Sequence, residues 1–295
     1  MALRERERIT LVIEEEVVRV MAVRKQEVTR WGSAPLPRHT LKEGQVANPQ
    51  ALAEVVQRLW HTQSQARPMP RQNILLAIPG HMIPTRIISA RNLETSDIEL
   101  MNQKAREILP QAHSHHVWQL IGSGAQARLF VMATPMALIE SYVEPLKRIG
   151  LGLSAMDIKP LALIRAVGQR HAIIIDAERT LGSVIIVDEA LPRRARFPVL
   201  QAPLLASPED KIMRLTEVLY ETIHAYNNGN QGQTLHPAVP IFLTGSLAHH
   251  ALLQDVVEHL LGHPIGTYTP SLKIPSDMPL SQFMVNVGLA KKQLK

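Results

Sequence analysis

The sequence predicts an α/β protein made of two similar halves, each with a mixed sheet of strands and with helices on both sheet faces. The main observation is an order of three strands, helix, strand, helix, strand and helix, which occurs twice and changes over near residue 168. A second observation is a segment of different order, strand, helix, strand and strand, that interrupts the first half. The third is composition, because 295 residues of which 45% are hydrophobic can form more than one core.

The first half begins with three short strands over 9–13, 17–23 and 27–33, which polar turns separate. We expect Asn48 to cap the helix that follows, because Pro49 suits a first helical turn. Apolar side chains then fall on one face of this helix: Leu52, Val55, Val56, Leu59 and Trp60. The rest of this half is predicted as strand, helix, strand and helix at 74–78, 134–150, 153–158 and 160–167.

The interrupting segment is predicted to form a small inserted domain. A strand over 83–90 precedes a helix that Ser96 begins, as part of a capping box, and that Pro110 ends. Two further strands, over 117–121 and 128–134, complete the segment. The predicted domains are a first lobe (1–81 plus 134–168), the insert (82–133) and a second lobe (169–295).

The second half repeats the element order of the first. Strands are predicted over 172–176, 181–187 and 194–199, and a long helix begins at Ser207. The later elements are a strand over 241–244, a helix over 247–261, a strand over 265–268 and a helix over 281–294. Each half would then be a three-strand meander that right-handed helical crossovers extend with parallel strands.

This tandem order resembles that of the actin/Hsp70 superfamily, which implies a duplicated actin-like ATPase (ribonuclease H-like) fold. The expected architecture is two mixed-sheet lobes with a small inserted α+β domain. Sheets of this kind bind ligands at the strand ends, here between the two halves. An unrelated two-domain α/β protein is the alternative interpretation.

Several motifs resemble the family of the type IV pilus assembly protein PilM. They include Ile78-Pro79-Gly80 before the insert, and Leu243-Thr244-Gly245 and Gly288-Leu289-Ala290 in the second half. The most specific stretch spans the crossover between the halves: Tyr142, Leu146, Gly150-Leu151, Asp157, Ala162-Leu163 and Arg165-Ala166. An insert at this position also occurs in the division protein FtsA and the type II secretion protein GspL, so a membrane-linked adaptor of either type is an alternative.

The phosphate-binding motifs of this fold are degenerate in the sequence. The resemblance implies that the first hairpin of each half grips phosphates with Asp-x-Gly followed by Ser or Thr. In the first hairpin the Asp position is Val12 and the Gly position is Glu14, while the basic residue Arg19 is retained. A glycine there lets backbone N–H groups approach a phosphate, and an Asp organises magnesium and water.

The second half keeps more of the motif, with Asp176 and Thr180 in its hairpin and Gly245-Ser246 in the adenosine loop, but it has Glu178 at the Gly position. Asp176, Thr180, Gly245 and Ser246 are therefore the candidate residues of a degenerate nucleotide cleft. A carboxylate about 4 Å from a phosphate charge costs about 1 kcal/mol in water and about 4 kcal/mol at an effective dielectric constant of 20.

We accordingly expect a pseudo-ATPase with no catalytic residue, no required cofactor and, at most, weak binding of ATP with magnesium. The alternative from another class is an active ATPase or kinase of the same fold.

Composition excludes several other classes of function. The absence of cysteine excludes disulfides, zinc thiolate sites and Cys nucleophiles, and it fits a reducing compartment. No run of about 18 apolar residues occurs. The net charge of +6 is densest at Arg193, Arg194 and Arg196, without interleaved aromatic residues. We therefore expect no nucleic-acid binding, and rather a basic face turned toward an acidic membrane surface or an acidic partner.

One cluster of histidines, His113, His115 and His116, falls on a predicted loop without a nearby carboxylate. A solvated loop explains it better than a metal site, so we expect no metal.

The resemblance to PilM also implies a partner. PilM-like proteins bind the cytoplasmic tail of the inner-membrane protein PilN and link pilus motor ATPases to the periplasmic alignment complex. We expect a cytoplasmic scaffold at the inner face of the cytoplasmic membrane, associated with the membrane through partners only. The family's PilN groove lies between the first lobe and the insert, which makes Ile83, Ile87, Ile98 and Met101 candidate contacts. The alternative is that these four residues form the core of the insert.

Overall fold

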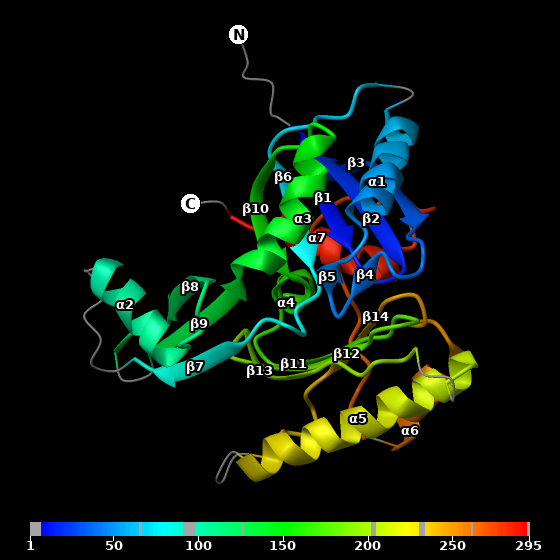
Figure 1. The fold of residues 1–295 in the computed structure, drawn as a ribbon. Helices are drawn as coiled ribbons and strands as arrows, with labels where there is room; N and C mark the ends of the chain where they lie inside the picture. Colours follow the sequence, from blue (N-terminus) through cyan, green and yellow to red (C-terminus); the bar gives the residue numbers. More distant parts are fainter. Residues whose placement is uncertain are drawn as a thin grey trace.

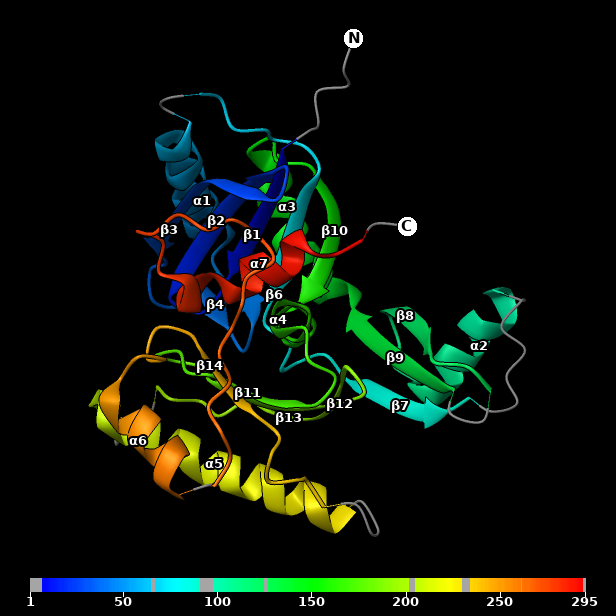
Figure 2. The ribbon, with the colours of Figure 1, turned by 180° about the vertical axis from the view of Figure 1, so that it is seen from behind.

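A computed structural model describes residues 7–64, 67–90, 98–124, 127–201, 205–229, 234–260 and 262–293. Two sheets lie one above the other in the body of the molecule, and a third, smaller sheet projects to one side (Figures 1 and 2). The first sheet has the order β10-β6-β1-β2-β3. Its strands are β1 (Arg8–Ile13), β2 (Val17–Arg24), β3 (Glu27–Pro35), β6 (Ile74–Ile78) and β10 (Leu153–Ile158).

Alternation along β1 directs its side chains to the two faces of the first sheet. Ile9, Leu11 and Ile13 belong to the core beneath α1 (Pro49–Gln63) and α3 (Met136–Arg148). Val12 belongs to a different core, beneath α4 (Lys159–Val167) and α7 (Met284–Ala290). The predicted cap of α1 is confirmed, since the Asn48 side chain accepts a hydrogen bond of 3.0 Å from the backbone N–H of Ala51.

The second sheet has the order β13-β12-β11-β14. Its strands are β11 (Ala172–Asp176), β12 (Ser183–Asp188), β13 (Leu191–Arg196) and β14 (Ile241–Thr244). The long helix α5 (Pro208–Gly229) and α6 (Ala251–Leu260) cover its outer face. Ser207 begins α5 as predicted, because its hydroxyl accepts a hydrogen bond of 3.1 Å from the N–H of Asp210.

The strand registers show that the two sheets are equivalent. In the first sheet β1 runs parallel to β6 from the pair Ile9–Ile74 to the pair Val12–Ala77. In the second sheet β11 runs parallel to β14 in the same way, from Ile173–Ile241 to Asp176–Thr244. Val12 and Asp176 therefore occupy equivalent positions.

The next strands extend this correspondence. Antiparallel pairing places Arg19 opposite Val12 and Ser183 opposite Asp176. Glu14 and Glu178, two residues beyond the equivalent positions, therefore also correspond.

Two helices, α4 and α7, lie between the sheets and join them. Their core contains Val12 and Leu75 from the first sheet together with Ile174 and Ile185 from the second. The two helices touch closely, because a Cβ atom at Gly288 would lie 1.7 Å from the carbonyl oxygen of Ala162. The C-terminal helix thus packs against the first sheet as well as against α4.

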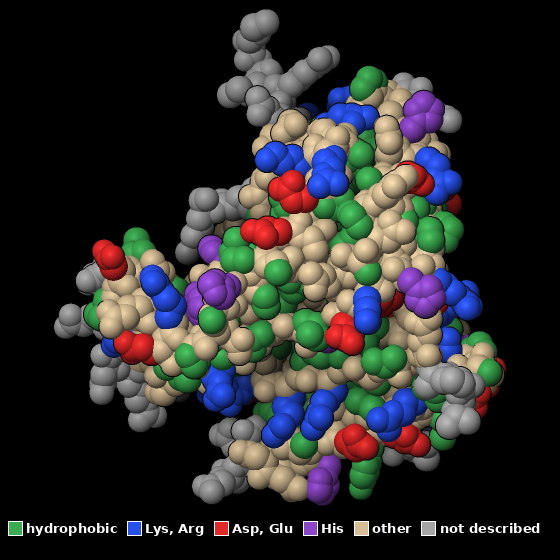
Figure 3. Space-filling model, in the orientation of Figure 1, with side chains coloured by type: hydrophobic (Ala, Val, Ile, Leu, Met, Phe, Trp, Pro, Cys, Tyr) green, Lys and Arg blue, Asp and Glu red, His purple; other side chains and the backbone are tan. Residues whose placement is uncertain are grey.

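The insert contains a three-stranded antiparallel sheet of order β7-β9-β8. The strands are β7 (Thr85–Ser89), β8 (Ser114–Ile121) and β9 (Arg128–Pro135), and helix α2 (Ile98–Ile108) covers one face. The predicted cap Ser96 lies outside the described residues. In the space-filling view the insert projects to the left of the body (Figure 3).

Several elements differ from the sequence predictions. A short hairpin, β4 (Leu41–Lys42) with β5 (Gln45–Val46), was not expected. The predicted strand over 265–268 is reduced to one bridge between Ile241 and Ile265. Gly266 lies against the ring of Phe242, where a Cβ atom would approach within 2.6 Å, so the chain crosses this ring instead of pairing further. His115 and His116 lie in β8 rather than in a loop.

The last predicted helix, 281–294, is shorter than expected. A 3-10 turn, η2 (Leu280–Phe283), precedes α7, which ends at Ala290. None of the described helices is long and apolar enough to cross a lipid bilayer.

Candidate functional site

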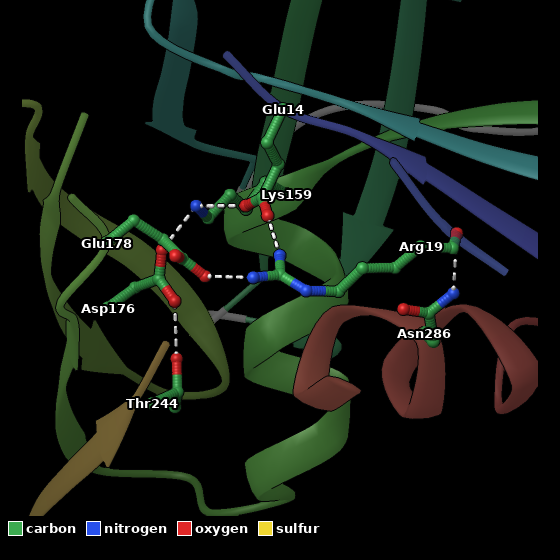
Figure 4. A network of polar contacts seen from close by, with 7 residues as sticks. All are labelled: Glu14, Arg19, Lys159, Asp176, Glu178, Thr244 and Asn286. Carbon is green, nitrogen blue, oxygen red and sulfur yellow. Dashed lines mark hydrogen bonds and ion pairs between the residues drawn. The ribbon is translucent and has the colours of Figure 1, made fainter. Parts of the chain in front are cut away.

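The tips of the two equivalent hairpins meet at the N-terminus of α4 and enclose a pocket of about 320 Å³. Glu14 directly follows β1, Asp176 ends β11, and Glu178 lies two residues beyond it. Arg19 comes from β2, and Lys159 is the first residue of α4. All five side chains point toward one another (Figure 4), so charged groups from both lobes form one cluster.

Ion pairs connect the five charged side chains into a continuous network (Figure 4). Arg19 pairs with Glu14 and, through Nη2 at 2.9 Å, with Oε1 of Glu178. Lys159 pairs with Glu14 and with Asp176. Glu14 thus binds two cations of the first lobe, and each of these cations also binds a carboxylate of the second lobe.

Neutral groups complete the network. The Thr244 hydroxyl donates a hydrogen bond of 2.6 Å to Oδ1 of Asp176. The side-chain amide of Asn286, on α7, donates to the backbone carbonyls of Thr10 and Arg19, at 3.2 Å and 3.4 Å. These bonds attach the charged cluster to β14 and to the C-terminal helix.

Burial sets the electrostatics of the cluster, because none of its five charged residues is more than 8% exposed. Burial alone would raise the pKa of Glu14, but Lys159 and Arg19 outweigh it, so this pKa is lowered. Burial raises the pKa of Glu178 to about 7, and the nearby charge of Glu14 acts in the same direction. Burial would lower the pKa of Lys159, but Asp176 and Glu14 more than compensate and raise it.

Three carboxylates against two cations leave one negative charge that no other charged member of the cluster balances. Because its pKa is raised to about 7, Glu178 is protonated below about pH 7, which removes this excess charge, and is ionised above that pH.

The predicted nucleotide-cleft residues come together in part. Asp176 is 2% exposed and lies in the network, and Thr180 and Ser246 line the pocket beside it. Gly245 has φ +93°, and a Cβ atom there would meet the backbone of Ala177 at 2.6 Å. The fold itself therefore requires glycine at this position, whether or not a nucleotide binds.

The arrangement does not fit magnesium and a triphosphate. Val12, at the position equivalent to Asp176, is a buried apolar residue that offers no ligand atom. The carboxylates of Glu14 and Glu178 lie at both glycine positions of the degenerate motifs, and they already neutralise the cations that phosphates would require.

Sequence reasoning missed Lys159 and left Ser183 and Thr244 out of the site, although Thr244 lies in the motif Leu243-Thr244-Gly245. Lys159 carries a detectable signal, because a cation at the start of a helix is unfavourable unless an anion compensates it. Ser183 is 1% exposed and its hydroxyl has no hydrogen-bond partner within the described residues, although it lines the pocket. Ser183 does not differ in sequence from an ordinary strand residue, and the motif that contains Thr244 does not indicate its hydrogen bond to Asp176.

The four residues predicted for partner binding divide into two pairs. Met101 is fully buried in the core of the insert, and Ile83 is buried in the core of the first lobe, so both are corrections to the proposed contact surface. Ile98 is 67% exposed, and Ile87 is partly exposed. The alternative interpretation, that these residues form the core of the insert, is therefore right for Met101 only, because Ile83 belongs to the core of the first lobe.

Two groups of side chains within the described chain place three possible metal ligands within 4.8 Å of one another. One is Glu14, Asp176 and Glu178, and the other is His171, Asp188 and Glu189. Both are already paired with Lys or Arg side chains. In the predicted histidine cluster, the ring of His116 is bonded to the carbonyls of Ser114 and Leu109 within the insert.

Comparisons with known proteins were made at the level of sequence and of structure. No family model matches the chain, and no curated protein does. The structure of a PilM-PilN type IV pilus biogenesis complex matches with a TM-score of 0.75 at 17% identity, over 97% of this chain and 98% of the other. The ethanolamine utilization protein EutJ from Carboxydothermus hydrogenoformans matches with a TM-score of 0.59 at 12% identity, over 98% and 91%.

A third match is the cytoplasmic domain of EpsL, an inner-membrane component of the type II secretion system of Vibrio cholerae. Its TM-score is 0.50 at 10% identity, over 98% of this chain and 97% of the other. The chain therefore has the actin-like ATPase fold, and the predicted resemblance to PilM is confirmed at the level of the fold.

Proposed function

We propose that this protein is an actin-like adaptor in the inner-membrane assembly complex of a type IV pilus or a related secretion system. In this proposal it lies in the cytoplasm at the membrane face, where it binds the cytoplasmic tail of a PilN-like membrane protein. A pilus motor ATPase is a further proposed partner. The protein works without ATP hydrolysis.

The observation that carries this proposal is the ion-pair network in the cleft between the hairpins. Each hairpin places a glutamate where the motif has glycine, and Arg19 and Lys159 are neutralised inside the protein. A buried charge that already has partners gains little by exchanging them for a phosphate, and two additional carboxylates repel one. The cleft therefore favours a closed scaffold over a nucleotide-dependent enzyme.

The match to the PilM-PilN complex supports the choice of partner, because it covers 97% of this chain, insert included. At the junction of the insert with the first lobe, three apolar side chains are 40–48% exposed: Met82, Val117 and Met136. Exposed apolar residues near one another can mark a protein contact. This junction surface is the proposed site for the PilN-like tail, with Ile98 as a candidate on the opposite face of the insert.

The test uses a fluorescent peptide from the cytoplasmic tail of a PilN-like membrane protein of the same organism. We expect micromolar affinity, about −8 kcal/mol, because a short extended peptide buries little area. Val117→Glu should weaken binding at least tenfold, and Ile98→Glu tests the other face. Tyr220→Glu is the matched control, since Tyr220 is 66% exposed on α5, away from the insert.

Phosphate release from ATP is measured on the same samples. We expect none above background. Turnover that disappears in Asp176→Ala would instead support the active ATPase or kinase. A peptide that fails to bind, or that binds Val117→Glu and Ile98→Glu as well as the unchanged protein, would exclude the proposed docking surfaces.

A further inference from the structure

A second groove separates the insert from the second lobe, at the opposite end of the insert's sheet from the junction surface. It has a volume of about 1100 Å³. One wall contains Ile87 and Ser89 of β7 with Arg128 of β9, and the other contains Arg170 and the β12–β13 turn. Basic side chains gather along this boundary in the space-filling view (Figure 3).

The strand β7 is an edge of its sheet and offers backbone groups to this groove. In an antiparallel pair, alternate residues exchange hydrogen bonds with the partner strand. The N–H of Ala90 donates to the carbonyl of Ala127, and the N–H of Ala133 donates to the carbonyl of Pro84. The even-numbered residues of β7 are therefore the ones whose backbone groups point toward β9. The N–H and C=O groups of Thr85, Ile87 and Ser89 therefore point away from β9, which allows an added strand.

The side chains of this wall combine apolar and basic character. Cross-strand pairing puts Ser89, Arg128 and Ile121 in one row, and Ile87 in the next row on the same sheet face. A strand added beside β7 would present every second side chain to this face.

Charges on the two walls leave an excess of positive charge. Arg170 pairs with Glu189, and Arg193 pairs with Asp188. Arg128 has no ion-pair partner within the part of the chain that the structure describes. Three arginines against two carboxylates give one net positive charge, which is complementary to an acidic ligand.

We propose that this groove binds an extended acidic segment of a partner protein, which adds as a strand to the free edge of β7. An apolar side chain of the segment contacts Ile87, and a carboxylate nearby pairs with Arg128. The main-chain bonds provide affinity, and the alternate side chains provide specificity. This site goes beyond the tail-binding site proposed above and does not depend on it.

The experiment uses the full chain, labelled with ¹⁵N, and an acetylated eight-residue peptide in which Val alternates with Asp. A composition isomer with all Asp residues at one end is the control peptide. We expect high-micromolar binding of the alternating peptide, with amide shifts at Thr85, Ile87 and Ser89. The control peptide should bind at least tenfold more weakly.

Two pairs of variants separate strand addition from charge. Ser89→Pro removes one outward N–H without touching a bond to β9, whereas Ser89→Ala keeps that N–H. We expect Ser89→Pro to lose binding and Ser89→Ala to keep it. Arg128→Gln should weaken binding about tenfold, since it removes a charge-assisted hydrogen bond. Arg86→Gln should not weaken binding, because Arg86 lies opposite Val131 in the strand register, on the sheet face that α2 covers.

Each result decides the proposal. Equal binding by Ser89→Pro and Ser89→Ala, with both variants folded by circular dichroism, would rule out strand addition. Equal binding by the two arginine variants would rule out recognition by Arg128. If the alternating peptide does not bind even at roughly 2 mM, a concentration well above the expected Kd, the proposed site is wrong. Because Val117→Glu lies at the other end of the sheet, it should leave this binding unchanged.

Discussion

At the scale of single residues, the cleft is defined by two glutamates at equivalent positions of two equivalent hairpins. The strand registers establish this equivalence independently of any motif, because Val12 and Asp176 end matching runs of four parallel pairs. Glu14 and Glu178 then follow at the same distance. Their carboxylates hold Arg19 and Lys159 in place.

Stability should depend on pH through Glu178. Its pKa is raised to about 7 in the folded protein, against 4.5 for the ordinary residue, so the folded state binds the extra proton between these values. The stabilisation is then complete below about pH 4.5 and is lost as the pH rises through about 7. The groups that face Glu178 in the cluster are Glu14, Arg19, Asp176 and Lys159.

The unchanged protein should lose on the order of 2 kcal/mol of unfolding free energy between pH 5 and pH 8, because Glu178 becomes ionised. Glu178→Gln should not show this loss. Urea unfolding of both proteins across this range measures it. The comparison cancels the histidines, which titrate in both proteins. Parallel stability curves for the two proteins would show that Glu178 does not carry the shared proton.

Nucleotide affinity should rise when the two glutamates are removed together. Glu14→Gly with Glu178→Gly takes away the negative charge of Glu14 and, above about pH 7, that of Glu178, and it leaves Arg19 and Lys159 opposite Asp176 alone. Glycine also permits a closer backbone approach to a phosphate. The matched variant Glu14→Gln with Glu178→Gln removes the charge but keeps the side-chain bulk.

We expect titration calorimetry to show tighter binding of ATP with magnesium in both double variants, and the larger gain with glycine. The same affinity in all three proteins would mean that the adenosine pocket, and not the hairpins, prevents binding.

At the scale of elements, hydrophobic patterning was sufficient for strands and helices that lie in one continuous core. The helix from Pro49 to Gln63 and its Asn48 cap could be predicted, because both the apolar stripe and the cap are local in sequence. The strand predicted over 265–268 was wrong, because Gly266 meets the ring of Phe242, and this contact depends on tertiary packing. Met101 and Ile83 were predicted as partner contacts but are buried, because hydrophobic patterning cannot distinguish core residues from exposed apolar ones.

Two tight hairpin turns carry backbone strain that sequence patterns did not reveal. Lys25 and Gln26 connect β2 to β3 with φ of 52° and 61°, and Glu189 and Ala190 connect β12 to β13 with φ of 55° and 61°. Positive φ is unfavourable for residues other than glycine, Asn and Asp. The two turns are another feature that the lobes share.

Gln26→Gly and Ala190→Gly should each stabilise the protein by about 1 kcal/mol, because glycine adopts these angles without strain. Thermal and urea unfolding would measure the gain. Gln26→Ala is the control, since alanine keeps the Cβ atom and should show no gain. A loss of stability in both glycine variants would mean that unfolded-chain entropy outweighs the strain at these turns.

At the scale of the whole molecule, the sequence could not predict which charges meet. Arg19 and Glu178 are separated by 159 positions in the sequence, and Lys159 and Glu14 by 145. The order of elements indicated that the two hairpins would face each other, because both begin a half of the duplicated fold. It could not indicate that the cations would be satisfied inside the protein, which depends on side-chain geometry at the sheet edges.

The network connects the two lobes directly, which leads to an expectation about their response to ligands. In the cluster, the first lobe contributes Glu14, Arg19 and Lys159, and the second contributes Asp176 and Glu178. These pairs connect the two hairpins without a bound nucleotide. We therefore expect ATP with magnesium to leave the arrangement of the lobes unchanged.

Hydrogen exchange monitored by mass spectrometry tests this expectation. Protection at both hairpin tips, 13–17 and 176–183, should be the same with and without nucleotide. In Arg19→Met, both tips should lose protection together, because the buried carboxyl group of Glu178 loses its ion pair and Glu14 keeps only Lys159. Removing one partner of a buried pair costs about 3–5 kcal/mol in other proteins. Arg214→Gln is the control, since it breaks only an exposed pair with Glu217 on α5. If nucleotide increased protection at both tips of the unchanged protein, the lobes would be responding to a ligand, and the network could not be what holds them closed.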